Sequence, residues 1–252
     1  MDTAPASQES PIVLLHGMVG DVDNWNSTIQ ELSQRGKRVI VPVLPIYSIA
    51  RTNADLDGLV GYLSDFFESL NIPPCLIGGN SMGGQLAVLF SVANPHHVER
   101  LLLSGASGIT EVDLGSSIMR RKDRAYLRNR IEKTFFDPIH CSEDLVDDIM
   151  DIINTRENAV RLISFARSVQ SESISALLSE IRIPTLIVWG NEDQITPVSV
   201  AYTLKKEIED STLEILDECG HAPMMEHPKR FNEVLLEFIA ATDLVSSEST
   251  LA

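Results

Sequence analysis

The sequence is poor in cysteine and has no long hydrophobic run. Its three cysteines, Cys75, Cys141 and Cys219, lie far apart and show no metal-ligand spacing. An odd number of scattered cysteines does not fit a disulfide framework and suits a reducing compartment. No uninterrupted apolar run approaches the roughly 20 residues that cross a bilayer, and the opening residues lack the basic and apolar regions of a secretory signal. We therefore expect a cytoplasmic protein that binds no metal and no membrane, with Cys75 in its core.

Positive charge is also scarce. The chain has 20 Lys and Arg residues against 36 Asp and Glu residues, which gives a formal net charge of −16 at pH 7. Because this excess of negative charge repels phosphates, we expect no binding to nucleic acid or to an anionic membrane surface. The 252 residues, 44% of them hydrophobic, are enough for one globular domain or for a core with an inserted subdomain. We expect an enzyme or binder of small molecules that is a monomer or a homodimer.

Short apolar runs alternate with helical patterns along most of the chain. Between the runs, apolar residues recur three or four positions apart, as Leu56, Leu59 and Leu63 do, which predicts helices. The alternation predicts right-handed βαβ crossovers and an α/β fold with a mostly parallel sheet, covered on both faces by helices. The runs with strand character are residues 11–17, 38–44, 74–79, 98–105, 184–190 and 211–217.

This alternation stops after Gly108. From about residue 110 to residue 180 no strand pattern appears, and apolar residues mark successive amphipathic helices. We expect a helical insertion at 110–180. The two parts of the core would then be residues 11–109 and 181–242, with flexible polar tails at 1–10 and 243–252.

Two charged stretches lie within the predicted insertion. Residues 120–130 are densely basic, and residues 142–151 are densely acidic. Solvated helix faces that pair loosely with one another are the expected interpretation. A binding patch for an acidic ligand or partner is the alternative.

One serine stands among four glycines in the stretch CLIGGNSMGGQLAVLF, residues 75–90. A serine hydroxyl becomes a useful nucleophile when a base takes its proton and donors stabilise the oxyanion that follows. A tight turn from strand to helix exposes the hydroxyl, but it crowds the backbone two residues before and after it. Gly79 and Gly83 satisfy that requirement around Ser81, so we predict that Ser81 is a nucleophile and that the Met82 N–H is an oxyanion donor. An ordinary turn with a capping serine is the alternative.

Later strand ends offer a base and an orienting acid. Glu192 and Asp193 follow the fifth strand-like run, and His221 follows the sixth in a loop flanked by glycine and proline. The chain order Ser81, Asp193, His221 is the order of a nucleophile-elbow hydrolase. We therefore predict a Ser81–His221–Asp193 triad, with Glu192 as the rival acid and His227 as the rival base.

The loop after the first strand-like run contains the sequence LLHGMVGDVDNW. We predict that the Met18 backbone N–H is the second oxyanion donor, beside that of Met82. His16 is expected to have a structural role, and Trp25 is expected to pack a helix against the sheet.

Taken together, these motifs resemble the α/β-hydrolase fold superfamily over nearly the whole chain. The motifs are His16-Gly17, the Gly-x-Ser-x-Gly elbow, Gly190-x-x-Asp193 with Pro197, and Gly220-His221. The resemblance implies a cap at 110–180 that roofs the active site, and it implies no metal or organic cofactor. Only ten residues precede the first parallel strand, so the β-hairpin that usually opens this fold has no room. We therefore expect six strands.

The substrate is a separate question, because a fold hosts many functions. GNSMGG and CGHAPMMEHP look most like the meta-cleavage-product hydrolases, which break carbon–carbon bonds of dienoates. Those enzymes usually carry a tryptophan after the catalytic histidine, where this chain has Ala222. They also carry a carboxylate-binding arginine where a rough alignment places Ile149, although Arg156, Arg161 and Arg167 are near.

We therefore interpret the chain as a carboxylesterase for small or medium acyl esters. Carbon–carbon hydrolysis is the alternative, and a ligand receptor built on a hydrolase fold is a third possibility. Substrate-binding candidates are the predicted cap and three residues after the second strand, Pro45, Ile46 and Tyr47.

Overall fold

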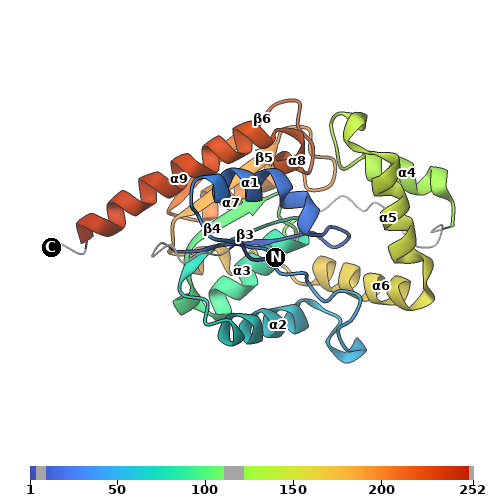
Figure 1. Cartoon of the computed structure of the whole chain (residues 1–252), viewed down its shortest axis with the longest axis horizontal. Coiled ribbons are helices and arrows are strands. Elements are labelled where there is room, and N and C mark those ends of the chain that lie inside the picture. The colour runs from blue at the N-terminus through green and yellow to red at the C-terminus, as the bar shows by residue number, and fades with distance from the viewer. Residues whose placement is uncertain (4–9, 111–121, 250–252) are drawn as a thin grey trace.

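A six-stranded, wholly parallel sheet forms the centre of the computed structural model, which describes residues 1–3, 10–110 and 122–249 (Figure 1). The strand order is β2-β1-β3-β4-β5-β6, and every neighbouring pair runs parallel. Each of the six predicted runs contains one strand, so the predicted α/β class and the strand number are confirmed. The strands are β1 (Ile12–Leu15), β2 (Val39–Ile40), β3 (Cys75–Asn80), β4 (Val98–Ser104), β5 (Thr185–Gly190) and β6 (Ser211–Leu216).

Helices cover both faces of this sheet. Helices α2 and α3 lie on one face, and α1 and α9 lie on the other (Figure 1). The helices are α1 (Asn26–Gln34), α2 (Leu56–Ser69), α3 (Met82–Ala93), α4 (Arg124–Glu132), α5 (Glu143–Asn154), α6 (Arg156–Ser171), α7 (Ser199–Glu207), α8 (Pro223–Glu226) and α9 (Pro228–Ser249).

Each face of the sheet carries its own hydrophobic core, because alternate strand residues point to opposite faces. In β1, Val13 and Leu15 belong to the cluster that includes residues of α2, α3 and α7. Ile12 and Leu14 belong to the cluster that includes residues of α1 and α9. Burial on both faces explains why the strand sequences are continuously apolar rather than alternating.

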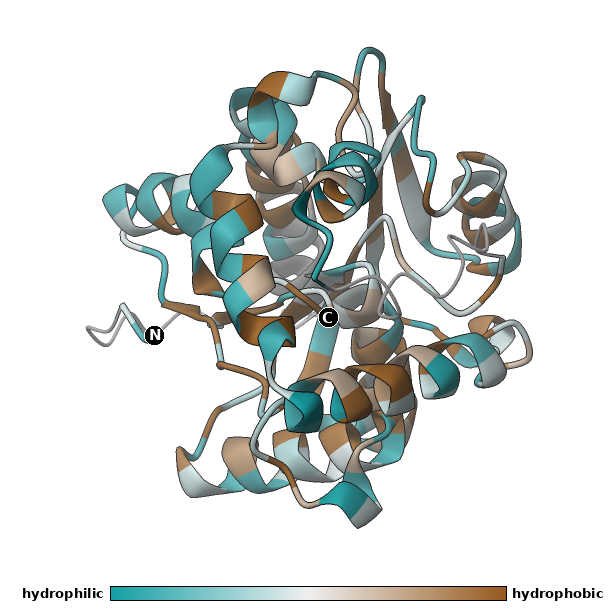
Figure 2. Cartoon of the chain, turned by 90° about the vertical axis from the view of Figure 1, so that its right-hand side faces the viewer, coloured by the Kyte–Doolittle hydropathy of each residue, from teal (hydrophilic) through white to brown (hydrophobic). Residues whose placement is uncertain are grey.

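Helices α4, α5 and α6 lie beyond one end of the sheet (Figure 1). Each of these helices has an N-cap residue whose side chain accepts a hydrogen bond from a backbone N–H of the first turn. The N-cap residues are Asp123, Ser142 and Thr155. These helices carry both hydrophobic and hydrophilic residues (Figure 2), as amphipathic helices do. Residues 111–121 of the predicted insertion lie outside the described residues.

The basic and acidic stretches of this region pair with each other. Arg124 lies 2.7 Å from carboxylate oxygens of both Glu143 and Asp147. Arg128 pairs with Glu132 at 2.9 Å and also with Glu143. The expected pairing of exposed helix faces is therefore present, and pairs of this kind contribute little to stability.

The chain ends contain regular structure in parts of the segments expected to be flexible tails. The Thr3 N–H donates to the Val39 carbonyl (3.0 Å), and Asp2 bridges Ile40 in antiparallel fashion, so residues 1–3 extend the β2 edge. Helix α9 continues to Ser249, which places most of 243–252 in a helix. Residues 4–9 and 250–252 of the predicted tails lie outside the described residues. No helix in the described part of the chain is long and apolar enough to span a membrane.

Candidate active site

Ser81 lies at the turn between β3 and α3, as the glycine pattern predicts. Its backbone has φ +59° and ψ −125°, a conformation that side chains with a Cβ rarely adopt. A Cβ on Gly79 would lie 2.3 Å from the Gly83 carbonyl carbon, and one on Gly83 would lie 2.3 Å from the Leu15 carbonyl oxygen. Because only glycine fits at both positions, the turn can bring Ser81 to the carboxyl end of the sheet.

Asp193 and His221 form a buried pair at the ends of the neighbouring strands. His221 Nδ1 lies 2.8 Å from Asp193 Oδ2, and each residue is no more than 6% exposed. Asp193 Oδ1 accepts the N–H groups of Ile195 (2.8 Å) and Thr196 (2.9 Å), and the Thr196 hydroxyl lies 2.9 Å from Oδ2. These donors hold the carboxylate in one orientation toward the imidazole.

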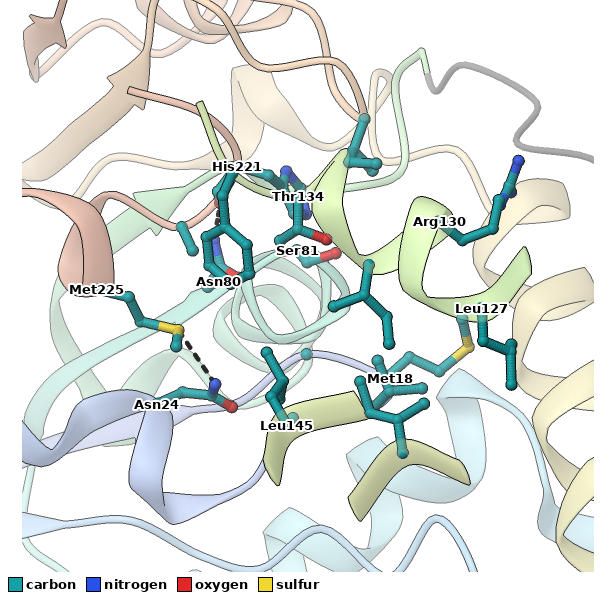
Figure 3. Close-up of a pocket in the computed structure, with 18 of the residues that line it drawn as sticks. Met18, Asn24, Asn80, Ser81, Leu127, Arg130, Thr134, Leu145, His221 and Met225 are labelled. Carbon is teal, nitrogen blue, oxygen red and sulfur yellow. Dashed lines mark hydrogen bonds between the residues drawn. The ribbon is translucent and has the colours of Figure 1, made fainter. Parts of the chain in front are cut away.

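Ser81 and His221 line the same pocket, and their side chains lie at one wall of it (Figure 3). Because Nδ1 of His221 faces the Asp193 carboxylate, the ring can carry its proton there and use Nε2 as an acceptor. Nε2 is buried and has no hydrogen-bond partner among the described residues. An Nε2 atom in this position can accept a proton from a hydroxyl group in the pocket, such as that of Ser81. Hydrogen bonds between a catalytic base and its hydroxyl often shorten only when substrate is bound.

The rival acid and base lie elsewhere. Glu192 Oε2 accepts the Cys219 N–H (3.1 Å), and its side chain does not line the pocket. The Nε2 atom of His227 lies 2.9 Å from the Glu218 carbonyl oxygen at an exposed site. The structure therefore places His221 in the same pocket as Ser81 and pairs His221 with Asp193, whereas neither Glu192 nor His227 lines that pocket.

The backbone around His221 is hydrogen-bonded to the segment between α4 and α5. The His221 N–H donates to the Thr134 carbonyl (2.7 Å). The Glu226 carboxylate accepts the N–H groups of Gly220 (2.9 Å) and Phe136 (2.6 Å), and burial raises the pKa of this carboxyl. The position of the histidine therefore depends on α4 and its neighbours, a link that no local sequence signal indicates.

The predicted oxyanion loop is fixed by two side chains. The Tyr47 hydroxyl donates to the Met18 carbonyl (3.1 Å), which sets the orientation of the Met18 peptide. Since the Leu44 N–H donates to His16 Nε2 (3.1 Å), the ring proton of His16 is on Nδ1 and donates to the Gly17 carbonyl (2.8 Å). Met82, the other predicted donor, is the first residue of α3.

The neutral state of His16 gives a testable dependence of stability on pH. The pKa of His16 is lowered below 6.5, and burial of the ring is the largest cause of this shift. As the pH falls from about 7.5 to about 5, the unfolded chain binds this proton before the folded chain does, so stability is lost across that interval. The difference in free energy of unfolding between the wild type and His16→Gln should therefore be largest near pH 7.5 and should narrow toward pH 5.

Urea titrations of the two proteins at several pH values provide the measurement. His96→Gln is the control, because His96 is exposed and should give a difference that does not change in this way. A wild-type advantage over His16→Gln that is constant with pH would contradict the assignment of a buried, neutral His16.

The pocket over Ser81 has a volume of about 310 Å³ and is predominantly apolar (Figure 3). This size is at the lower end of small-molecule sites. Its polar lining includes Asn24, Asn80, Thr134 and Arg130. The side chains contributed by α4–α6 include Leu127, Ile131, Leu145, Ile149, Ile153 and Leu162.

Other predicted substrate contacts do not line this pocket. The lining of the pocket does not include Pro45, Ile46 or Tyr47. Ile46 is buried in the hydrophobic core, and the Tyr47 hydroxyl donates a hydrogen bond to the Met18 carbonyl. Arg161 donates to the Ile49 carbonyl and pairs with Glu157. Arg156 and Arg167 are exposed and are also absent from the lining.

The described residues offer no cluster of side chains that could bind a metal ion. Among residues 1–3, 10–110 and 122–249, no three His, Cys, Asp or Glu side chains are grouped closely enough to hold a metal ion.

Comparison with known proteins shows a family and several relatives. The sequence model of the alpha/beta hydrolase family matches residues 12–234. A 2-hydroxy-6-oxononadienedioate/2-hydroxy-6-oxononatrienedioate hydrolase of Cupriavidus pinatubonensis is 30% identical over 251 residues, which cover 90% of this chain and 86% of that protein. Human monoacylglycerol lipase ABHD6 is 27% identical over 255 residues, which cover 91% of this chain and 75% of the lipase.

A solved structure shares the fold across almost the entire chain. It is a mutant of the meta-cleavage product hydrolase CumD of Pseudomonas fluorescens IP01, complexed with acetates. The two chains are 25% identical and superpose with a TM-score of 0.81, over 93% of this chain and 92% of CumD.

Proposed function

The chain belongs to the alpha/beta hydrolase family, and on that premise we propose that it is a serine hydrolase that cleaves small to medium acyl esters. The observation that carries the choice of ester is the apolar pocket beside Ser81. An apolar acyl group gains free energy by leaving water for such a pocket. We also propose a cytoplasmic location, because three free, buried cysteines suit a reducing compartment. We further propose that the protein is a monomer or a homodimer.

In this mechanism His221 Nε2 takes the Ser81 hydroxyl proton while Ser81 Oγ attacks the ester carbonyl carbon. Asp193 keeps the histidine proton on Nδ1 and stabilises the imidazolium that forms. The N–H groups of Met18 and Met82 stabilise the oxyanion. The alcohol leaves with the proton from His221, and water then releases the acid from the acyl-enzyme by the same sequence.

Carbon–carbon bond hydrolysis is the second candidate, and the named relatives support it more directly than they support ester cleavage. The relative from Cupriavidus pinatubonensis is named for oxononadienedioates and oxononatrienedioates, and CumD is a meta-cleavage product hydrolase. The same groups would serve, with attack at a ketone carbonyl and departure of a carbon leaving group. The lining of the pocket supports this candidate less. Among its described residues, Arg130 is the one Lys or Arg, and its guanidinium points away from Ser81 (Figure 3).

A substrate panel separates the two candidates. We expect sustained turnover of 4-nitrophenyl esters of short and medium acyl chains, and slower turnover of a 2-hydroxy-6-oxo-dienoate ring-fission product. Activity confined to the dienoate would replace the ester proposal with the carbon–carbon candidate. One acylation without further turnover would instead favour a ligand receptor.

A further inference from the structure

The side-chain hydroxyl of Thr196 lies between the acid and the base of the site and the backbone of a neighbouring strand. Its Oγ1 atom lies 2.9 Å from Asp193 Oδ2, 3.2 Å from His221 Nδ1 and 3.1 Å from the Gly105 carbonyl oxygen. Thr196 is fully buried, and a hydroxyl has one proton to donate and two lone pairs that accept. This hydroxyl can therefore donate to the Gly105 carbonyl or to the Asp193 carboxylate and keep a lone pair toward the Nδ1–H of His221.

Gly105 directly follows β4, at the strand end that also holds the nucleophile. The Ser81 N–H donates to the Ser104 carbonyl (3.0 Å), and the Ser107 N–H donates to the Ser81 carbonyl (3.1 Å). The histidine ring packs closely against the same strand end, because a Cβ on Gly105 (φ +53°) would lie 2.9 Å from His221 Nδ1. The end of β4 is therefore a shared support for the nucleophile and the base.

Asn80 and Thr196 connect this strand end to the catalytic histidine, and they hold different parts of it. Asn80 Nδ2 donates to the carbonyl of His221 (2.8 Å) and to the carbonyl of Ser104 (3.0 Å), so it fixes the main chain. Thr196 acts at the imidazole and at its carboxylate partner. Rotation of the ring would move Nε2 relative to the nucleophile without moving the main chain. Control of that rotation consequently depends on Asp193 and Thr196.

The backbone of Thr196 is held by hydrogen bonds that do not involve its hydroxyl. Its N–H donates to Asp193 Oδ1 (2.9 Å), and its carbonyl accepts the indole N–H of Trp189 (2.9 Å). Removal of the hydroxyl should therefore leave the residue in its place. The contribution of the hydroxyl to the site can thus be measured without loss of the loop that carries the acid.

We propose that Thr196 is a positioning residue whose hydroxyl ties the aspartate–histidine pair to the end of β4 and keeps the imidazole aligned with Ser81. Alignment matters because a misplacement of reacting groups by about 1 Å can cost about a hundredfold in rate. The hydroxyl adds a second contact to the Nδ1 side of the ring, beside the carboxylate, and anchors both to the strand that holds the nucleophile. This inference rests on the proposed hydrolase function and adds a residue to its machinery.

Two replacements of Thr196 separate the hydroxyl from the packing of the side chain. Valine nearly keeps the shape of threonine without the hydroxyl, whereas serine keeps the hydroxyl and lacks the methyl group. Thr196→Val should lower kcat for the preferred ester by about tenfold to a hundredfold, and Thr196→Ser should stay within about threefold of the wild type. KM should change less than about twofold in either variant, because Thr196 does not line the pocket. Wild-type kcat in Thr196→Val, or a larger loss in Thr196→Ser, would overturn the proposal, since packing alone predicts that order.

Thr185→Val is the matched control. Thr185 is also fully buried, and its hydroxyl donates to the Ile183 carbonyl (3.0 Å) at the amino end of β5, whereas the site lies beyond the carboxyl end. The control therefore removes a buried hydroxyl away from the pocket, and kcat should stay unchanged. Thermal midpoints show that each variant is folded at the assay temperature. A loss of kcat in Thr185→Val as large as that in Thr196→Val would overturn the proposal.

The rate of covalent labelling keeps this test separate from the proposed function. A fluorophosphonate reacts with an activated serine hydroxyl and needs no ester turnover. Slower labelling of Ser81 in Thr196→Val than in both the wild type and Thr196→Ser would support the positioning role even if no ester were hydrolysed. Ester turnover at the wild-type rate in Thr196→Val would reject that role and leave the proposed hydrolase intact. A wild type that neither labels at Ser81 nor turns over any ester would overturn both.

Discussion

Replacement of Ser81 by alanine is expected to lower kcat for the preferred ester by roughly 10³- to 10⁶-fold. The reason is that the mechanism has no other atom to form the acyl-enzyme. His221 Nε2 is buried and has no hydrogen-bond partner among the described residues, which leaves it available to accept the Ser81 proton. The measurement is steady-state release of 4-nitrophenol, with enzyme concentrations high enough to detect the residual rate.

The control for this variant is its folding. Alanine keeps the Cβ that already fits at Ser81, so the strained turn retains its shape, and the thermal midpoint should stay close to that of the wild type. Gly83→Ala provides the contrasting variant, because its Cβ would meet the Leu15 carbonyl oxygen at 2.3 Å and should disturb the turn itself. Wild-type turnover by a folded Ser81→Ala protein would rule out Ser81 as the nucleophile.

Asp193→Asn is also expected to give a large loss, about 10⁴-fold in kcat. The asparagine side chain nearly matches the carboxylate in shape but carries an amide that donates hydrogen bonds. In either orientation the amide NH₂ would point a donor at groups that are themselves donors, either the N–H groups of Ile195 and Thr196 or the Nδ1–H of His221. The histidine would then favour the tautomer with its proton on Nε2, where it cannot accept the proton of Ser81.

Glu192→Gln is the matched control, since it makes the same chemical change one residue away. Glu192 accepts the Cys219 N–H outside the pocket, so the loss in kcat should be mild. Asp193→Asn should also leave KM almost unchanged, because the carboxylate does not line the pocket. Equal losses in the two variants would show that the acid has been assigned wrongly.

Much of the fold follows from local sequence patterns. The strand runs are recognisable because a sheet buried on both faces demands continuous apolar residues, and all six contain a strand. The turn at Ser81 is recognisable because close backbone contacts exclude side chains at Gly79 and Gly83. Trp25 packs as expected, fully buried and with its ring centroid 6.0 Å from that of Phe231.

The supporting residues of the site could not be predicted in this way. Thr196, Glu226 and Tyr47 act through partners at distant chain positions, such as His221, Phe136 and Met18. Only the folded chain brings these atoms within hydrogen-bond distance. Arg130 is an intermediate case. Its spacing from Leu127 and Ile131 can be read from the sequence, but the pocket that these residues line can be seen only in the structure.

The regular structure at the chain ends could not be predicted for a different reason. Polar composition predicted flexible tails, yet residues 1–3 pair with the exposed edge of β2, and α9 extends to Ser249. An unpaired strand edge offers backbone groups to any nearby segment, whatever its side chains. Composition alone does not report such backbone pairing.

The central claim is that Ser81 is activated by His221 and Asp193, and covalent labelling tests it most directly. The wild type is incubated with a fluorophosphonate, which reacts with activated serine hydroxyls, and the labelled peptide is located by mass spectrometry. The account predicts one label per chain, on Ser81, and much slower labelling in His221→Ala. Absence of a label on Ser81 in a folded protein, or a label on another serine, would contradict the account.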